Sequence, residues 1–157
     1  MALSEKIQQD MVAAMKQHEE LRLSTLRMMK SAIQYRKVDA GHAGQELDDA
    51  EVQKVLGTMI KQREDSAEQF AAGGRPELAA KEKAEIGIIE SYLPRALSPE
   101  EIEVTVREAI AASGASSPKD MGKAMKAAMA RFQAQQLRAD GKLVSAAITR
   151  ILSGQNG

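Results

Sequence analysis

Apolar residues recur at intervals of three and four positions along almost the whole chain, and they show no strand-like alternation with polar residues. This interval places side chains on one face of an α-helix. The composition agrees, because aromatic residues make up only 3% of the chain and any core must be filled largely by Ala, Leu, Ile and nine Met. Ala, Leu and Met favour helices, whereas aromatic residues favour strands. We therefore expect an all-α fold.

Start and stop signals divide this pattern into about seven helices. Ser98-Pro99 and Ser117-Pro118 each place a capping Ser before a first-turn Pro, with an acidic residue close behind, which is typical of a helix start. Gly73-Gly74 is predicted to end a long amphipathic helix. The predicted N-caps are Ser4, Asp48, Ser98, Ser117 and Asp140.

The strongest break in the pattern holds two prolines within six residues, Pro94 and Pro99. Proline disfavours helical backbone in the residue before it. We place a domain boundary here. Residues 1–94 are expected to form an N-terminal helical domain of about four helices, and residues 95–157 a small C-terminal domain of three helices.

The formal net charge of zero hides a difference between the two parts of the chain. Residues 1–94 carry 13 Lys and Arg against 16 Asp and Glu, whereas residues 95–157 carry nine against six. Within residues 109–157 the count is seven against two. Such an asymmetry indicates an anionic partner for the basic part.

Few residues suggest catalysis. There is no Cys, and the two histidines are His18, expected to be partly buried on the first helix, and His42, expected to be exposed in a loop. The sequence has no serine nucleophile-elbow pattern and no glycine-rich phosphate loop. We expect no catalytic residue, no metal ligand and no cofactor.

The best candidate surface is basic. Lys119, Lys123 and Lys126 fall on one face of a predicted helix, opposite a stripe that includes Met121, Met125 and Met129. An ordinary solvated helix face is the alternative interpretation. We predict an RNA-binding surface built from Lys119, Gly122, Lys123, Lys126, Arg138, Lys142 and Arg150, together with Arg27 and Lys30 from the basic stretch between residues 21 and 38.

Five segments together resemble the YqeY-like family, and they occur in the family's order over nearly the whole chain. They are Arg22–Met29, Ile60–Ser66, Tyr92–Pro94, Asp120–Lys123 and Ala139–Lys142. That family is similar to the tail domain of GatB, the subunit of tRNA-dependent amidotransferase that grips tRNA with its tail. One departure is Leu137-Arg138, where the family often has a Gly-Lys pair.

The resemblance implies a tRNA-binding accessory module, with Gly122, Lys123, Asp140, Gly141 and Lys142 at the tail's recurring positions. It also implies the class of glutamine-dependent carbon–nitrogen ligases, but the nucleophile and the ATP site of such an enzyme are missing from this sequence. Two alternatives stay open: a component of an amidotransferase activity, and a helical protein–protein adaptor.

The expected partners are tRNA, bound weakly, and a translation-related protein, with neither DNA nor membrane among them. Met1–Glu5 does not begin a signal-peptide pattern, and no 18 apolar residues run together. We therefore expect a cytoplasmic location.

Overall fold

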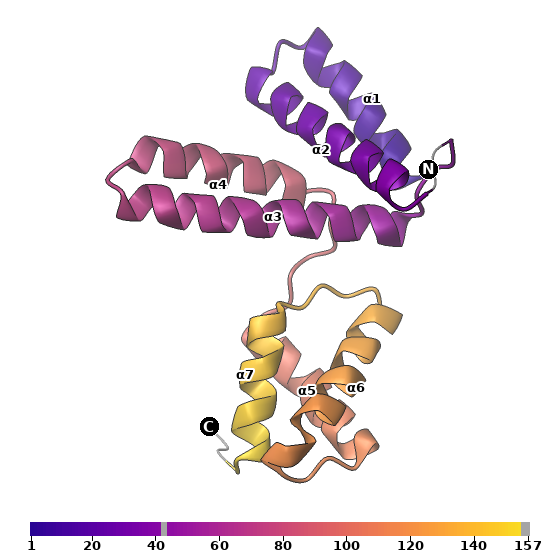
Figure 1. The fold of residues 1–157 in the computed structure, drawn as a ribbon, viewed down its shortest axis with the longest axis vertical. Coiled ribbons are helices and arrows are strands. Elements are labelled where there is room, and N and C mark those ends of the chain that lie inside the picture. The colour runs from indigo at the N-terminus through magenta and orange to yellow at the C-terminus, as the bar shows by residue number, and fades with distance from the viewer. Residues whose placement is uncertain (42–43, 155–157) are drawn as a thin grey trace. The chain divides into compact units, whose positions relative to one another are not determined.

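The computed structural model describes residues 1–41 and 44–154, and these form seven α-helices and one 3-10 turn (Figure 1). The described residues include no β-strand. Their one isolated β-bridge joins Ala96 and Arg138. The predicted all-α fold class is therefore confirmed. His42, expected to be exposed in a loop, lies outside the described residues.

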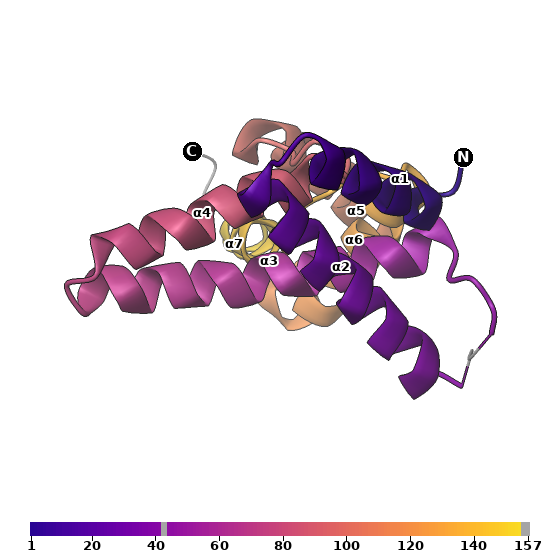
Figure 2. The ribbon, with the colours of Figure 1, turned by 90° about the horizontal axis from the view of Figure 1, so that it is seen from above.

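The helices group into two compact units, Met1–Leu93 and Pro94–Gly157. The first unit consists of two helical hairpins, and the α1–α2 hairpin lies across the α3–α4 hairpin (Figures 1 and 2). The loop between α3 and α4 projects beyond this crossing (Figure 2). The four helices are α1 (Leu3–Lys16), α2 (Glu20–Asp39), α3 (Asp49–Ala72) and α4 (Pro76–Glu90).

The second unit is a three-helix arrangement in which each helix packs against the other two. It consists of α5 (Pro99–Ser113), the 3-10 turn η1 (Pro118–Asp120), α6 (Met121–Ala134) and α7 (Gly141–Leu152). Each unit has a hydrophobic core of its own, with Leu26 and Ile60 fully buried in the first and Val106 and Ile148 in the second.

Several predicted helix starts are made by local contacts. The side chains of Asp48 and Ser98 accept hydrogen bonds from the backbone N–H of the residue three positions on, at 2.8 and 3.2 Å. Asp140 accepts from the N–H of Lys142 at 2.8 Å. Ser117 and Asp120 form the capping box of η1. These residues satisfy amide donors that the first turn of a helix leaves without a partner.

The prediction for the first helix was partly wrong. Its N-cap is Ala2 and not Ser4, and its first amide, that of Leu3, donates to Oδ1 of Asp49 at 2.9 Å. The helix ends at Lys16. His18 lies beyond it, exposed and in the left-handed region with φ 59°, so it is not part of a buried face.

The apolar stripe predicted for α6 was also partly wrong. The residues that α6 buries are Ala124, Ala128 and Phe132, while Met121 and Met125 pack at the edge of the core and Met129 is 37% exposed. Ala124 and Ala128 lie at the centre of this face, and their small side chains leave room for α5, which packs against α6. None of the helices that the structure describes combines the length and the hydropathy needed to cross a membrane.

Candidate nucleic-acid interface

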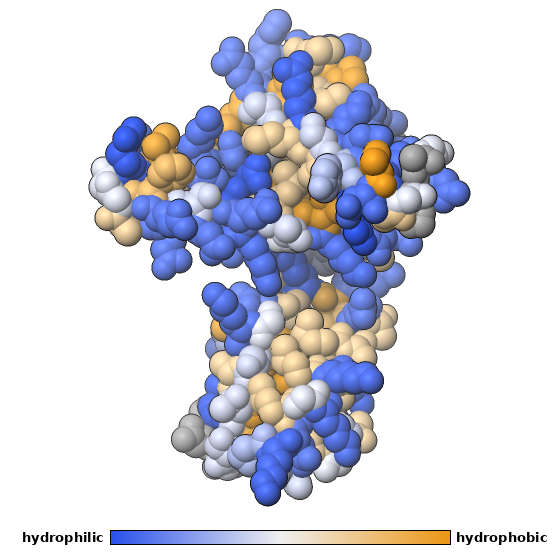
Figure 3. Space-filling view, viewed as in Figure 1, coloured by the Kyte–Doolittle hydropathy of each residue, from blue (hydrophilic) through white to orange (hydrophobic). Residues whose placement is uncertain are grey.

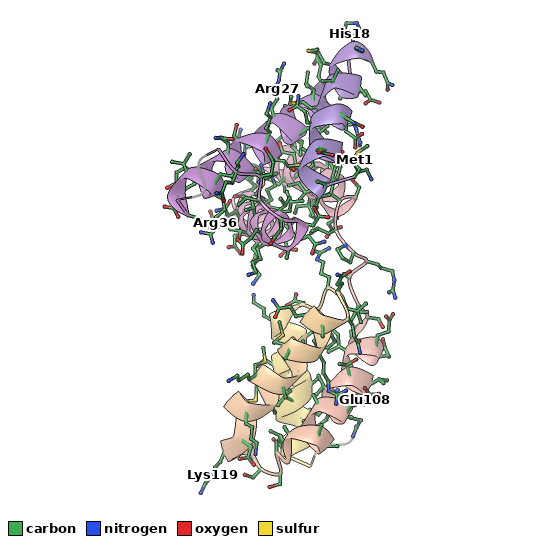
Figure 4. The ribbon with its side chains drawn as sticks, turned by 90° about the vertical axis from the view of Figure 1, so that its right-hand side faces the viewer. Met1, His18, Arg27, Arg36, Glu108 and Lys119 are labelled. Carbon is green, nitrogen blue, oxygen red and sulfur yellow. The ribbon has the colours of Figure 1, made fainter. Side chains whose placement is uncertain are left out.

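The start of α6 presents three lysines to solvent, Lys119 from η1 and Lys123 and Lys126 from the helix itself. No ion pair involves any of the three among the described residues. Figure 4 shows Lys119 pointing away from its unit. Because α6 buries its opposite side around Ala124 and Ala128, these ammonium groups are held on the surface by the packing of the helix.

The turn before α6 is fixed by Asp120. Its Oδ2 accepts hydrogen bonds from the backbone N–H groups of Ser116 at 2.9 Å and Ser117 at 3.3 Å. These bonds, and to a lesser degree the charge of Lys123, hold the pKa of Asp120 below its usual value. The carboxylate therefore stays ionised and keeps the lysine-bearing turn in place.

Lys123 lies beside the end of α5. Its Nζ lies 3.8 Å from the position that a Cβ would take on Gly114, which ends α5 in the left-handed conformation. The carbonyl end of a helix carries a partial negative charge that favours a cation. Lys123 thus contributes to the end of α5 as well as to the exposed lysine face.

Gly122 is exposed, and apart from its chain neighbours and the backbone of its own helix no described atom lies within 4 Å of the position of a Cβ on it. Its φ angle is not in the left-handed region, so the fold does not require glycine there. No other element of the described chain approaches this position closely, and the space beside it is open.

The start of α7 supplies a further exposed cation, Lys142, next to the N-cap Asp140. Arg138 lies just before it and is half-buried, and its backbone carbonyl accepts a hydrogen bond from the N–H of Leu97 at 2.9 Å. The turn that follows α6 uses Gln136 in the left-handed region, with φ 54°. This turn therefore forms without the glycine that the family often has nearby.

Arg150 was predicted to belong to the same basic surface, but it forms an ion pair within its unit. Its Nη2 lies 3.3 Å from Oε1 of Glu103. The same oxygen accepts from Nη2 of Arg107 at 2.9 Å, and these two cations, Arg107 foremost, lower the pKa of Glu103. Arg131, which shares α6 with Lys123 and Lys126, likewise forms an ion pair, with Glu108 at 3.5 Å.

The cations of the basic stretch in α2 are also of two kinds, those paired with a carboxylate and those without such a partner. Arg22 pairs with Asp10 and Glu19, Arg36 with Asp39 and Glu51, and Lys37 with Glu46. Arg27 and Lys30 are exposed, and the described residues offer no ion-pair partner to either. In Figure 4 Arg27 points away from the helices of its unit.

The structure thus brings only some of the predicted residues together. Lys119, Gly122, Lys123 and Lys126 share η1 and the start of α6, while Lys142 and Arg150 lie on α7 of the same unit. Arg27 and Lys30 lie in the first unit. Figure 3 shows that hydrophilic residues dominate the visible face of the first unit. The visible face of the second unit carries a larger share of weakly hydrophobic residues.

Sequence reasoning missed one exposed aromatic residue. Tyr35 on α2 is 74% exposed, whereas the chain's other tyrosine, Tyr92, is only 7% exposed. The helical period gives the signal for this difference, because Tyr35 falls two positions beyond the buried Ile33, on the far side of the helix.

Two of the segments that resemble the family meet in a polar network, through Arg22 near the start of α2 and Tyr92 just after α4. The hydroxyl of Tyr92 donates to Oδ2 of Asp10 at 2.5 Å and accepts from Nη2 of Arg22 at 3.2 Å. The Nζ of Lys6 lies 5.5 Å from the centre of the Tyr92 ring. These contacts tie α1, α2 and the end of α4 together, so the role that they indicate is structural.

Within the described ranges, no group of three or more His, Asp or Glu is arranged to hold a metal ion.

The described residues define a small all-helical protein whose second unit exposes a lysine face at the start of α6. The sequence model described as "Yqey-like protein" matches residues 4–152, so the chain belongs to the YqeY-like family.

The relatives carry the name "Altered inheritance of mitochondria protein 41, mitochondrial". The protein of Lachancea thermotolerans is 32% identical over 71% of this chain and 60% of its own length. That of Kluyveromyces lactis is 33% identical over the same shares, and that of Clavispora lusitaniae is 37% identical over 59% of this chain and 52% of its own length. The chain therefore spans little more than half the length of these relatives.

The expectation of a cytoplasmic location was wrong on this finding, because the relatives are named as mitochondrial proteins. The expectation rested on the absence of a targeting pattern in the first residues of the sequence.

Proposed function

We propose that this YqeY-like chain is a tRNA-binding accessory module without a catalytic site of its own. The observation that carries the proposal is the division of its cations into two groups. Arg131 and Arg150 of the second unit are engaged by carboxylates, whereas Lys119, Lys123, Lys126 and Lys142 are exposed and have no ion-pair partner among the described residues. Unpaired exposed cations are the groups that neutralise phosphates.

Contacts of this kind recognise the backbone and the shape of an RNA. The aromatic residue of the second unit, Phe132, is 2% exposed and cannot stack on a base. Lysine ammonium groups act on phosphates as point charges and carry no sequence preference. The module would therefore grip double-helical parts of tRNA, with a dissociation constant in about the micromolar range or above.

The likeness of Asp120–Lys123 and Ala139–Lys142 to the GatB tail supports the same proposal. In the structure these segments form the starts of α6 and α7. Asp140 caps the start of α7, Asp120 closes the capping box of the turn η1 just before α6, and both starts carry an exposed lysine. The amide end of a helix favours negative charge, so a phosphate that meets these lysines is also near a favourable helix end.

A salt titration of tRNA binding tests the proposal. Each neutralised phosphate of a duplex contributes about −0.9 to the slope of log affinity against log salt. Three lysines, or four with Lys142, predict a slope of about −2.7 to −3.6. Changing Lys119, Lys123 and Lys126 together to Glu should remove most of the affinity for tRNA while circular dichroism shows the helices unchanged.

Two further variants make this test specific. A matched control changes Lys61, Lys81 and Lys83, three exposed lysines of the first unit, to Glu, with the same change in net charge. It should bind tRNA nearly as well as the original chain. The double change of Lys119 and Lys126 to Glu tests the same lysine face without changing Lys123, which lies beside the end of α5. Absence of tRNA affinity at low salt, or equal losses in the α6 variant and the matched control, would reject the proposal and favour a protein–protein adaptor.

A further inference from the structure

The outward side of α2 carries an aromatic residue that the fold does not use. Tyr35 is 74% exposed, and the described residues supply no hydrogen-bond partner for its hydroxyl. Tyr92, in contrast, is buried and its hydroxyl contacts both Asp10 and Arg22. Tyr35 and Val38, three positions further along α2, are both exposed on one side of the helix, and adjoining exposed apolar side chains mark a candidate contact surface.

Tyr35 lies on a stripe with Arg27. The two residues are eight positions apart, with Ser31 halfway, and successive intervals of four keep side chains on one side of a helix. Val38, 60% exposed, continues the stripe by one turn, whereas Lys30 lies nearer to α1, where it lines a hollow with Glu5 and Gln8. The stripe therefore combines an exposed ring, an apolar neighbour and one cation, Arg27, that has no ion-pair partner among the described residues.

The charges on this side of α2 favour an anionic partner. No acidic residue occurs between Leu21 and Val38. The other cations of the stretch, Arg22, Arg36 and Lys37, are engaged by carboxylates of neighbouring segments. Arg27 and Lys30 are the cations of this stretch that have no ion-pair partner among the described residues, so they can meet a ligand. An anionic ligand with flat rings fits the stripe, and a single-stranded nucleic acid has both properties.

We propose that the Tyr35–Arg27 stripe is a second RNA contact, which binds an unpaired nucleotide. The Tyr35 ring stacks on the base, and Arg27 neutralises a phosphate. This inference rests on the proposed function and extends it. The lysine face of the second unit grips duplex backbone, and the α2 stripe recognises an unpaired part of the same class of RNA.

Because the chain contains no Trp, the change of Tyr35 to Trp places a single fluorescent reporter on the stripe. A short oligouridylate, which does not form base pairs, should quench this fluorescence at low salt, and a blunt RNA duplex should not. The change of Tyr35 to Ala should weaken oligouridylate binding about fivefold or more, since stacking contributes at least about 1 kcal/mol per base. Tyr35→Phe should keep the affinity because it keeps the ring, and Arg27→Gln should reduce the affinity.

Several outcomes would overturn the inference. One is fluorescence that the oligouridylate leaves unchanged, together with unchanged affinity of the Tyr35→Ala variant. Equal quenching by the blunt duplex is another. A third is loss of self-association, measured by sedimentation, in the Tyr35→Ala or Val38→Ala variant without an effect on RNA, which would make the stripe an interface between copies of the chain.

The experiment also separates this inference from the proposed function. The triple change of Lys119, Lys123 and Lys126 to Glu should leave quenching of Trp at position 35 by oligouridylate intact. If tRNA binding proves independent of those lysines while the quenching persists, the proposed function fails and the α2 contact stands. If the lysines control tRNA binding and no quenching occurs, the proposed function stands and the α2 contact is rejected.

Discussion

The Nε of Arg63 lies 3.0 Å from Oε2 of Glu85, and the two side chains are only 12% and 8% exposed. This ion pair joins α3 to α4. Arg63 also donates to the carbonyl of Met59 at 3.3 Å and contacts Sδ of Met28 at 3.4 Å. The segment around Arg63 is one of those that resemble the family, and the structure gives this Arg a structural role.

Removing one member of this pair should destabilise the first unit strongly. Glu85→Ala leaves the Arg63 guanidinium buried without its counter-charge, which costs about 3 kcal/mol in the free energy of unfolding. Urea unfolding followed by circular dichroism measures the loss. Glu77→Ala breaks the exposed pair with Arg75 and should cause no measurable change, because solvent screens such a pair. Equal effects of the two variants would show that the Arg63–Glu85 pair has no special weight.

The Tyr92 hydroxyl gives the first unit a dependence on high pH. Burial, followed by the hydrogen bond to Asp10, raises the pKa of Tyr92 above its ordinary value of 10.0. Its contribution to stability is therefore complete below pH 10 and is lost as the pH rises towards the folded-state pKa, because the unfolded chain releases the proton first.

Tyr92→Phe tests this dependence. The variant should be less stable at neutral pH, by about 1 kcal/mol for the lost hydrogen bonds. Above pH 10 the gap between the variant and the original chain should narrow, since the variant has no proton to release. Urea unfolding of both proteins across this range measures the gap. A gap that stays constant would place the ionisation of Tyr92 outside the folding equilibrium.

The features predicted correctly from sequence are those that local chemistry determines. Asp48, Ser98 and Asp140 cap helices through contacts within three residues, so their sequence context was sufficient. The cap of α1 could not be predicted in this way, because Asp49 lies 46 positions from Leu3. The burial of His18 was predicted wrongly for a related reason, since the helical period was extended past the turn at Gln17 that ends α1.

The same limit applies to the candidate site. The sequence groups Arg150 with Lys142 by position and charge alone. Whether a cation pairs with a carboxylate depends on tertiary contacts, as between Arg150 and Glu103 on different helices. The lysines of α6 were identified as one exposed face because their position depends only on the period of a single helix.

A fragment of residues 95–157 should fold by itself. Its core includes Ile102, Val106, Phe132 and Val144, which all lie within the fragment. The backbone hydrogen bond from Leu97 to Arg138 is also retained. Circular dichroism should show a helical spectrum and a cooperative thermal transition. A coil spectrum would mean that these helices need residues 1–94 in order to fold.

The pure chain should release no ammonia from glutamine and hydrolyse no ATP. The sequence offers neither a Cys nucleophile nor a glycine-rich phosphate loop. A coupled ammonia assay and a phosphate-release assay measure the two reactions. Activity above a buffer control that a point substitution in this chain removes would contradict the expectation and support an amidotransferase component.

The last prediction compares an unpaired cation with a paired one in the same unit. Lys126 has no ion-pair partner among the described residues, whereas Arg150 is held at 3.3 Å from Glu103. Lys126→Gln should make the salt slope of tRNA binding shallower by about 0.9, the loss of one phosphate contact. It should leave the urea midpoint unchanged because the side chain is exposed.

Arg150→Gln should do the opposite. Its slope should stay that of the original chain, since the guanidinium is already engaged by a carboxylate and releases few counterions on binding. Its urea midpoint should fall, because α7 loses its ion pair to Glu103 on α5. If Arg150→Gln changes the slope as much as Lys126→Gln does, RNA must draw Arg150 away from Glu103, and ion pairing in the free chain would not decide which cations reach the phosphates.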